Sequence, residues 1–554
     1  MTFSTKTLSQ TVTHLCLAKG IDHIVISPGS RNAPLTLGFT GQPEFHNFSI
    51  VDERCAAFFA LGLAQQLGRP VAVVCTSGSA LLNYYPAIAE AFYSDIPLVV
   101  LSADRPEHLI DVGDGQTIRQ KEVYANHILY SANCKEGDDY QEFNETQING
   151  ALNAALEQNG PVHINLPFSE PLYETRSTAE VVPTNSPPRV SSEGFTDSLT
   201  PLIKNWNRSE RKMVLVGVLP PKSIESEVVK HLGADESVIV FTETTSNLHH
   251  EQFFPSIDQM IAPLDDNDFK DLQPEVLLTF GGMVVSKKIK AFLRAYPPKY
   301  HYHVDPKRAM DTFFCLTQHI KKDVNSLFNI LLTEFKEVKS DYRKYWLTLK
   351  SYRLKRHESY MEQISFTDFL VVEQIVAALP QDIQLQLANS ATVRYSQLFS
   401  LHPSLHVFCN RGTSGIDGST STAIGAAVAS TLPTIFITGD LSFFYDSNAL
   451  WNDYIPANFR IIILNNGGGG IFRILPGNKD SKEFSTYFET KHELTASQLA
   501  KMYGFKYKEA RDVASLKDAL NGYFKNTGAP KILEVFTPSE ENDTVLLEYF
   551  NFLK

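Results

Sequence analysis

The sequence predicts an α/β protein built from three doubly wound, parallel-sheet domains. Short apolar runs alternate with helical patterns along the whole chain, which is typical of parallel sheets covered by helices on both faces. A length of 554 residues suffices for three or four domains. A Pro- and Ser-rich stretch at 176–194 predicts an interdomain linker. We expect domains at 1–180, 195–345 and 358–554.

Each segment has its own set of expected strands. In the first, apolar runs predict strands at 23–27, 71–75, 97–102 and 162–167. In the second, they predict strands at 212–217, 237–241, 276–282 and 300–304. In the third, they predict strands at 385–389, 434–440, 460–466 and 531–536.

Three helices stand out between these strands. Residues 53–67 predict a helix that ends at Gly68, because glycine readily adopts the left-handed conformation of a C-cap. The Ala-rich run 419–429 predicts a helix suited to close packing, either within the core or against a partner subunit. Residues 336–356 carry eight basic and two acidic residues on a helical pattern, which predicts a solvated connecting helix.

The composition excludes several classes of protein. Hydrophobic residues make up 43% of the chain and charged residues 20%, a globular rather than a disordered balance. A net charge of -12 argues against a general binder of nucleic acid or anionic membranes. The six cysteines are scattered without a CxxC pair, and no apolar run approaches the roughly 18 residues of a membrane span. We therefore expect a cytoplasmic protein with no membrane span and no nucleic-acid partner.

The most specific motif lies at the ends of two expected strands in the third segment. Asp440 follows the run 434–439, and Asn466 ends the run 460–466 and precedes four glycines. The 25 residues between them accommodate one helix that returns the chain to a neighbouring parallel strand. Carboxyl ends of parallel strands bind ligands, and carboxylate, amide and carbonyl oxygens suit Mg²⁺ holding a diphosphate. Taken alone, this pattern predicts a metal–diphosphate site at Asp440, Asn466 and the following glycines, here Gly468, with two ordinary strand-end turns as the alternative.

This Gly-Asp to Asn-Asn spacing resembles the diphosphate-binding motif of thiamine-diphosphate-dependent enzymes. Leu441 stands where that family usually has glycine, and the Ser442 hydroxyl is available for phosphate. Glu53 opens an apolar helix, and in isolation it is most simply a first-turn acid favoured by the helix dipole. In the family, a glutamate at this place hydrogen-bonds the aminopyrimidine N1′ of the cofactor. The resemblance therefore implies a catalytic role for Glu53.

Five further motifs narrow the resemblance. They are SPGSRNAPL (27–35), ADRPEHL (103–109), DGQTIRQ (114–120), NSATVR (389–394) and NRGTSGIDGSTSTAIGAA (410–427). In this order they closely resemble the 2-succinyl-5-enolpyruvyl-6-hydroxy-3-cyclohexene-1-carboxylate synthase family of menaquinone biosynthesis, over essentially the whole chain. The resemblance implies a transferase that decarboxylates 2-oxoglutarate and adds the succinyl carbanion equivalent to isochorismate.

The same resemblance implies the cofactors, the assembly and the role of each domain. The cofactors are thiamine diphosphate with Mg²⁺ or Mn²⁺, and the assembly is a homodimer or a dimer of dimers with shared sites. Residues 1–180 become the pyrimidine-binding domain that carries Glu53. Residues 195–345 become the central domain, and residues 358–554 become the diphosphate- and metal-binding domain.

Site residues follow from the matching motifs. The implied cofactor contacts are Glu53, Ser390, Ile416, Asp440, Leu441, Ser442, Asn466, Gly468, Gly469 and Ile471. The implied contacts to the two dianionic substrates are Ser30, Arg31, Arg105, Gln116, Lys288, Ser390, Arg394, Arg411, Phe472 and Leu475. Guanidinium groups suit bidentate carboxylate binding, although any single arginine is about as often part of a structural ion pair.

Three residues depart from the family pattern. Lys288 stands in a stretch where the family often has an arginine, Gly115 stands where an asparagine is common, and Gly467 interrupts the usual asparagine run. An ammonium group makes a single contact where a guanidinium group makes two. These departures bear on substrate affinity rather than on the class of reaction.

Two alternatives stay open at this point. Another thiamine-diphosphate-dependent 2-oxo acid decarboxylase, or an enzyme like acetolactate synthase, shares the metal motif, but the arginine set favours dianionic substrates. A non-catalytic, metabolite-binding regulator on the same fold is more remote, because both Glu53 and Asp440 are present. A nicotinamide-dependent dehydrogenase is disfavoured, since no GxGxxG motif follows a strand.

Overall fold

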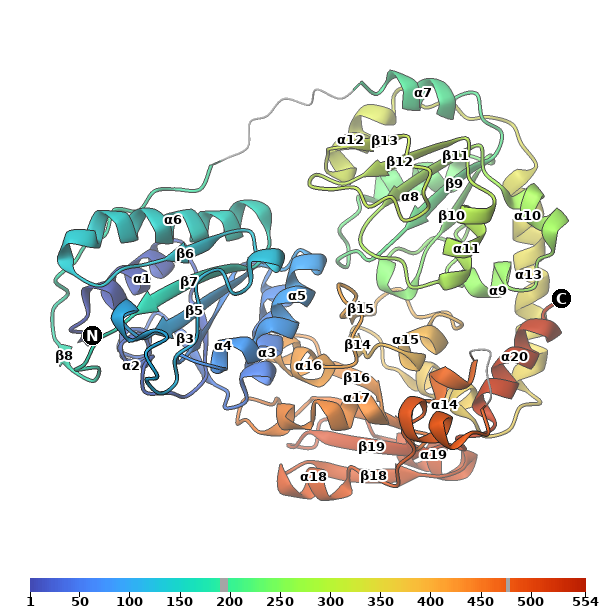
Figure 1. Ribbon diagram of the computed structural model, residues 1–554. Coiled ribbons are helices and arrows are strands. Elements are labelled where there is room, and N and C mark those ends of the chain that lie inside the picture. The colour runs from blue at the N-terminus through green and yellow to red at the C-terminus, as the bar shows by residue number, and fades with distance from the viewer. Residues whose placement is uncertain (190–197, 475–478) are drawn as a thin grey trace.

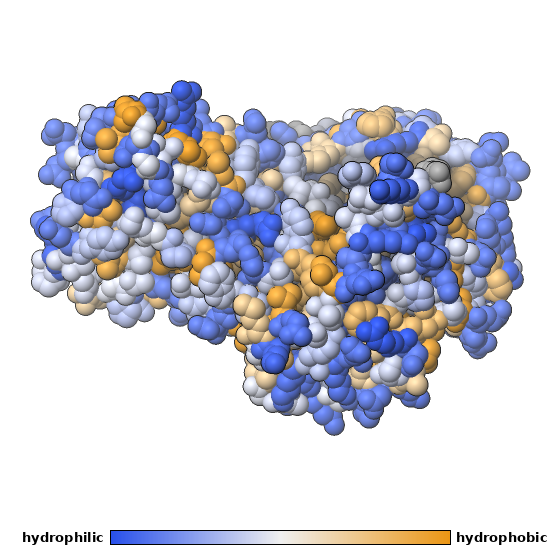
Figure 2. All heavy atoms as spheres, turned by 60° about the horizontal axis from the view of Figure 1, so that its bottom comes forward, coloured by the Kyte–Doolittle hydropathy of each residue, from blue (hydrophilic) through white to orange (hydrophobic). Residues whose placement is uncertain are grey.

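Three parallel β-sheets, one in each third of the chain, form the architecture, which confirms the predicted fold class (Figure 1). The computed structural model describes residues 1–189, 198–474 and 479–554. In Figure 1 the N-terminal sheet lies on one side, and the central sheet lies above the C-terminal sheet on the other. Figure 2 shows that hydrophilic residues cover most of the displayed face, with separate smaller groups of hydrophobic residues between them.

The N-terminal domain has a six-stranded sheet in the order β3-β2-β4-β5-β7-β6, all neighbours parallel. Its strands are β2 (His23–Ile26), β3 (His46–Ser49), β4 (Val71–Cys75), β5 (Leu98–Asp104), β6 (Ser131–Asn133) and β7 (Val162–Pro167). Its helices are α1 (Thr7–Ala18), α2 (Ala33–Thr40), α3 (Glu53–Leu67), α4 (Ala80–Asn83), α5 (Tyr85–Ser94) and α6 (Gln141–Gln158). A short antiparallel pair, β1 (Phe3–Ser4) and β8 (Thr175–Arg176), closes the domain.

The central domain has a five-stranded parallel sheet in the order β10-β9-β11-β12-β13. Its strands are β9 (Lys212–Val216), β10 (Val238–Phe241), β11 (Val276–Phe280), β12 (Tyr300–Val304) and β13 (Gln318–Ile320). Its helices are α7 (Thr200–Trp206), α8 (Ser226–Ala234), α9 (Ile257–Ile261), α10 (Asp266–Leu272), α11 (Lys287–Ala295) and α12 (Val324–Leu331).

The C-terminal domain has a six-stranded parallel sheet in the order β15-β14-β16-β17-β19-β18. Its strands are β14 (Gln384–Leu387), β15 (His406–Cys409), β16 (Thr434–Gly439), β17 (Arg460–Asn465), β18 (Lys506–Ala510) and β19 (Lys531–Phe536). Its helices are α14 (Asp368–Ala378), α15 (Ala391–Ser396), α16 (Ser419–Ala429), α17 (Asp440–Tyr445), α18 (Ser497–Met502), α19 (Val513–Leu520) and α20 (Asn542–Phe552).

Helices α3 and α16 join the N-terminal and C-terminal domains within the one chain. A Cβ on Gly62 would lie 2.1 Å from the Thr422 carbonyl oxygen, and one on Gly425 would lie 2.0 Å from the Phe59 carbonyl oxygen. Both positions therefore need glycine, because the two backbones touch. The side chains of these helices belong to one apolar core that reaches the facing strands of both sheets. The Ala-rich helix expected at 419–429 is thus found, and it packs closely against its own chain.

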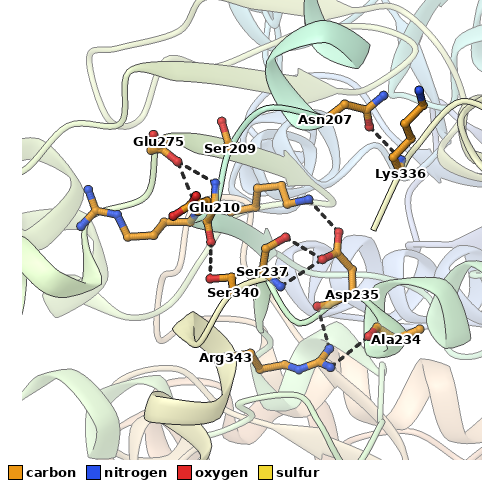
Figure 3. A network of polar contacts seen from close by, with 12 residues as sticks. Asn207, Ser209, Glu210, Ala234, Asp235, Ser237, Glu275, Lys336, Ser340 and Arg343 are labelled. Atoms are coloured by element: carbon orange, nitrogen blue, oxygen red, sulfur yellow. Dashed lines mark hydrogen bonds and ion pairs between the residues drawn. The ribbon is translucent and has the colours of Figure 1, made fainter. Parts of the chain in front are cut away.

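Helix α13 (Tyr342–Met361) connects the central and C-terminal domains as expected, but it is only partly solvated, because one side of it is buried. Trp346 lies in the core of the central domain, and the Arg343 guanidinium donates to the carbonyl oxygens of Ala234 and Asp235 at the end of α8 (Figure 3). The Asp235 carboxylate in turn binds the buried Lys212 ammonium at 2.7 Å. Basic residues of α13 therefore fasten the helix to the domain as well as meeting solvent.

None of the described helices is long and apolar enough to cross a membrane. All six cysteines are free thiols, and five of them are buried.

Candidate active site

Asp440 and Asn466 lie at the same edge of the C-terminal sheet. Strands β16 and β17 are parallel neighbours, with Gly439 aligned to Leu464, so both chains leave the sheet side by side. Asp440 is 2% exposed, and its carboxylate accepts hydrogen bonds from the backbone N–H groups of Leu441 at 2.6 Å and Gly468 at 3.0 Å. The expected adjacency of the two strand ends is therefore present.

The side-chain oxygen of Asn466 is the clearest sign of a ligand site here. The Asn466 Nδ2 atom donates to Asp368 Oδ2 at 2.8 Å, whereas Oδ1 is buried and accepts no hydrogen bond among the described residues. Buried polar atoms without a partner are rare in proteins, and they often mark a missing ion or ligand. The unpartnered Asn466 oxygen and the buried Asp440 carboxylate, at adjacent strand ends, fit a divalent cation with oxygen ligands.

The glycines after Asn466 allow the chain to turn tightly at this place. Gly468 has a φ of 152°, and a Cβ there would lie 2.5 Å from the Glu489 carbonyl oxygen. His492, from the segment that follows, places its Nε2 atom 3.4 Å from Asp440 Oδ2. The sequence analysis missed His492, because a lone histidine 52 positions after Asp440 gives no motif.

Ser442 and Ile416 connect the metal motif to the loop before α16. The Ser442 hydroxyl donates to the Ile416 carbonyl oxygen at 2.6 Å, which holds the half-buried Ile416 next to α17. Leu441 and Ser442 both lie in the first turn of α17, whose N-terminus favours an anion such as phosphate. Ile471 and Phe472 lie just beyond the glycines in a 3₁₀ turn (Gly470–Ile474), whereas Leu475 falls outside the described residues.

Ser390, Arg394 and Arg411 form a second group on the C-terminal domain. Ser390 has a φ of 73° between β14 and α15, a strained conformation that is often found at functional sites. Burial, together with the nearby Arg411 charge, lowers the pKa of Arg394. Arg411 donates to Asn389 Oδ1 at 2.6 Å, while its buried Nε has no acceptor among the described residues. Two neighbouring guanidinium groups with an unused donor suit an anionic ligand.

The central domain adds a loop near Arg411, because the buried Glu243 that this loop binds interacts with the Arg411 charge. The backbone N–H groups of Val285 and Ser286 donate to the buried Glu243 carboxylate, each at 2.7 Å. Burial raises the pKa of Glu243 to about 7, against the lowering effects of these hydrogen bonds and of the Arg411 charge. Lys288, which follows this loop, is exposed, and its ammonium lies 4.9 Å from the ring centre of Phe550.

The N-terminal domain carries its own group of expected substrate residues. Arg31 is 4% exposed, donates to the Phe168 carbonyl oxygen at 2.8 Å and pairs with Glu170 at 3.2 Å. Burial, followed by the nearby Arg105 charge, lowers the pKa of Arg31. The Nε atoms of Arg31 and Arg105 are buried and have no acceptor among the described residues. Ser30 and Gln116, also expected here, are exposed.

Glu53 is the first residue of α3 and is half-buried. The N-cap residue Asp52 accepts a hydrogen bond from the Cys55 N–H, which fixes the start of the helix. The Glu53 carboxylate accepts a hydrogen bond from Asn83 Nδ2 at 3.3 Å, within the same domain. Its second oxygen is therefore available to a ligand that approaches the helix start.

The expected site residues fall into two sets, one on the N-terminal domain and one on the C-terminal domain, although the neighbours of Glu53 bond to residues 445–448. Among the described residues, no hydrogen bond or ion pair joins the N-terminal set to the C-terminal set. The N-terminal set is Ser30, Arg31, Glu53, Arg105 and Gln116, and the C-terminal set is Ser390, Arg394, Arg411, Ile416, Asp440, Ser442, Asn466 and Gly468.

Glu90 is a further residue that the sequence analysis missed. It lies in α5 of the N-terminal domain and is 1% exposed. Its carboxylate accepts hydrogen bonds from the backbone N–H groups of Gly412 and Thr413, each at 2.6 Å, and from the hydroxyl of Thr413 at 2.8 Å. Glu90 therefore anchors the loop that carries Arg411 to the other domain of the same chain.

Glu90→Gln is expected to destabilise the protein by about 2–4 kcal/mol, because an amide NH₂ then faces N–H donors that were bound to a charged acceptor. The Michaelis constant of a substrate bound by Arg411 should rise as well, since the loop loses its anchor. Urea unfolding and steady-state kinetics measure the two effects. Ser94→Ala is the matched control, because it removes only the 2.8 Å hydrogen bond that Ser94 donates to Glu90. Equal behaviour of the two variants would contradict the anchoring role.

Comparisons with known proteins agree with this architecture. The family model for the thiamine pyrophosphate enzyme N-terminal TPP binding domain matches residues 6–125, and the C-terminal TPP binding domain model matches residues 390–535. A 2-succinyl-5-enolpyruvyl-6-hydroxy-3-cyclohexene-1-carboxylate synthase of Christiangramia forsetii is 54% identical and covers 100% of both chains. Synthases of the same name from Flavobacterium psychrophilum (55% identical, 99% of this chain, 98% of the relative) and Porphyromonas gingivalis (38% identical, 97% and 95%) are also similar. The chain therefore belongs to the 2-succinyl-5-enolpyruvyl-6-hydroxy-3-cyclohexene-1-carboxylate synthase family of thiamine pyrophosphate enzymes.

Proposed function

We propose that this transferase decarboxylates 2-oxoglutarate and adds the succinyl carbanion equivalent to isochorismate, giving 2-succinyl-5-enolpyruvyl-6-hydroxy-3-cyclohexene-1-carboxylate and CO₂ in menaquinone biosynthesis. The product is the compound in the names of the full-length relatives. The observation that carries the proposal is that the buried Asp440 and the Asn466 Oδ1 atom, which has no partner among the described residues, both lie at adjacent strand ends. We also propose the cytoplasm as its location.

The chain offers a defined set of groups for the cofactor. Asp440, the Asn466 side chain and the Gly468 carbonyl would bind Mg²⁺ or Mn²⁺, while Ser442 and Gly469 would meet the diphosphate. Ile416 and Ile471 would pack against the rings, with Leu441 and Ser390 beside them. Glu53 would hold a proton at N1′ of the aminopyrimidine. When bound, thiamine diphosphate supplies the electron sink that takes up the charge left by loss of CO₂.

The arginines would orient the two dianionic substrates. Arg394 and Arg411, with Lys288 nearby, offer one cationic pocket, and Arg31 and Arg105 offer another. The buried Nε atoms of Arg31, Arg105 and Arg411, which have no acceptor among the described residues, support this role, since a carboxylate would satisfy them. The substrate-contact set is completed by the polar groups of Ser30, Gln116 and Ser390 and by the apolar Phe472 and Leu475. The apolar pair would exclude water from the reacting carbon.

Mass spectrometry of products tests the proposed reaction. The protein is incubated with thiamine diphosphate, Mg²⁺, 2-oxoglutarate and isochorismate, and the expected product forms only when all four are present. Release of CO₂ from pyruvate instead would favour an enzyme like acetolactate synthase or another 2-oxo acid decarboxylase. Binding of both substrates without turnover would favour a regulator.

We further propose a homodimer, alone or as a dimer of dimers, in which each site combines the Glu53 set of one chain with the Asp440 set of another. Among the described residues of one chain, no hydrogen bond or ion pair joins these two sets, which leaves both open to groups supplied by a second chain. The adjoining surfaces of α3 and α16 are already used within the chain, where the two backbones touch. The second chain would therefore approach from a different side of Glu53.

Mixing two inactive variants tests the shared site. Glu53→Gln and Asp440→Ala chains are expected to regain activity after subunit exchange, because some mixed dimers hold one site with both defects and one site with neither. Activity is measured after exchange has been demonstrated with chains that carry different affinity tags. A mixture that remains inactive despite exchange would contradict the shared-site dimer.

A further inference from the structure

We propose that Asp368 is a positioning residue of the metal site, which fixes the Asn466 amide with its oxygen toward the cation. The inference deepens the proposed function and rests on it, because it assumes that Asn466 ligates the metal. Asp368 belongs to no motif singled out in the sequence and lies 98 positions before Asn466. The structure brings the two side chains together from the beginning and the middle of the C-terminal domain sequence.

Asp368 is held rigidly from three directions. It is the first residue of α14 and is 2% exposed. The Thr537 hydroxyl, just after β19, donates to its Oδ1 atom, and its backbone N–H donates to Asn542 Oδ1 at 2.8 Å at the start of α20. Its Oδ2 atom accepts the 2.8 Å hydrogen bond from Asn466 Nδ2. The contact to Asn542 fixes the backbone at Asp368, and the carboxylate cannot turn away from Asn466 without also breaking its hydrogen bond from Thr537.

The chemistry of this contact decides which way the amide faces. A carboxylate has only acceptor atoms, so its neighbour must present the NH₂ side of the amide. The Asn466 Oδ1 atom then faces away from Asp368, and it is the atom that is buried with no partner among the described residues. Without this constraint the amide could rotate by 180° and present an NH₂ group to the cation, which would repel it.

The neighbouring Asp440 side chain is fixed by a different set of contacts. Its oxygens accept from the backbone N–H groups of Leu441 and Gly468, so its direction is set by the loop itself. A carboxylate also presents an oxygen in either orientation, whereas an amide does not. Of the two side chains, only Asn466 requires an orienting partner, and Asp368 supplies it. Partners of this kind commonly change metal affinity by 10–100-fold when they are removed.

The test measures binding of Mn²⁺ in the presence of thiamine diphosphate by electron paramagnetic resonance, with the full-length protein. Asp368→Asn is expected to weaken Mn²⁺ binding by at least about tenfold. The new amide can donate to Asn466 Oδ1, which turns the Asn466 NH₂ group toward the cation. Circular dichroism and thermal unfolding verify that the variant is folded.

A swapped pair separates orientation from a merely structural role. In the double variant Asp368→Asn/Asn466→Asp, the new amide donates to one oxygen of the new carboxylate, and the other oxygen faces the cation. The net charge of the pair is unchanged, and Mn²⁺ affinity should return to within about threefold of the wild type. Thr537→Val is the matched control, because it removes the other partner of the same carboxylate and leaves the contact to Asn466 in place.

The outcomes are distinct. Weak binding by Asp368→Asn, recovery in the swapped pair and near-normal binding by Thr537→Val support the proposal. Normal binding by Asp368→Asn, no recovery in the swapped pair, or an equal loss in Thr537→Val overturns it. If the wild-type protein itself shows no cofactor-dependent Mn²⁺ binding, the metal site of the proposed function fails instead.

Discussion

Glu53→Gln is expected to leave the protein folded and to lower kcat by at least about a hundredfold, the usual size of a general acid–base contribution. The amide has nearly the volume of the carboxyl group but cannot hold an exchangeable acid proton at N1′ of the cofactor. Hydrogen–deuterium exchange at C2 of bound thiamine diphosphate, followed by NMR, measures the affected step directly. Steady-state rates measure its consequence.

The position of Glu53 means that Glu53→Gln should lower the free energy of unfolding only slightly. It is a half-buried, first-turn residue of α3, where an acid contributes about 0.3–1 kcal/mol through the helix dipole. Asn83→Ala is a suitable control, because it removes the 3.3 Å hydrogen bond to Glu53 and keeps the carboxyl group. The control should retain far more activity than Glu53→Gln. Wild-type exchange and turnover in Glu53→Gln would refute the assignment.

The strands that the sequence predicts are those covered on both faces. Runs such as Val71–Cys75 and Arg460–Asn465 are buried at every position, so they appear as continuous apolar segments. In the three large sheets, five strands escape prediction, and all five are edge strands: β3, β6, β13, β15 and β18; the short pair β1 and β8 escapes it as well. An edge strand meets solvent, and β18 (Lys506–Ala510) buries only its last residue. Its sequence therefore carries no apolar run.

Helix α13 shows a second limit of sequence patterns. Its charged residues suggest exposure, yet Arg343 is buried because three carbonyl groups at the end of α8 accept its hydrogen bonds. Long basic side chains can bury their stems and pair their ends, which periodicity does not reveal. The Ala-rich composition of α16 did predict close packing. It did not identify Gly62 of α3 as the place where the two backbones meet.

The residues of the candidate site also differ in whether the sequence could predict them. Asp440 and Asn466 were predictable, because each follows a buried strand and the spacing between them fits one crossover. Asp368, His492 and Glu90 were not, because each comes from a distant element and forms no local motif. The residues proposed to contact the metal directly leave a pattern in the sequence. Residues that orient them through one hydrogen bond are found only once the chain is folded.

Asp440→Ala is expected to weaken Mg²⁺-dependent binding of thiamine diphosphate by at least about a hundredfold, which corresponds to about 2.7 kcal/mol. Asp440 would be the anionic ligand of the metal, and the cation loses both charge compensation and an inner oxygen when it is removed. Isothermal titration calorimetry with and without Mg²⁺ measures the change. Affinity equal to the wild type would exclude Asp440 from the metal site.

Asp440 also supports its own loop, so the loss of a ligand must be separated from the loss of local structure. Its carboxylate accepts from the Leu441 and Gly468 N–H groups, and alanine would leave both buried donors unpaired. Asp440→Asn keeps one acceptor oxygen for the loop and removes the charge. If the metal role is right, Asp440→Asn unfolds near the wild-type temperature but still binds the cofactor at least about tenfold more weakly. If Asp440 only shapes the loop, Asp440→Asn binds thiamine diphosphate with wild-type affinity, and only Asp440→Ala binds it weakly.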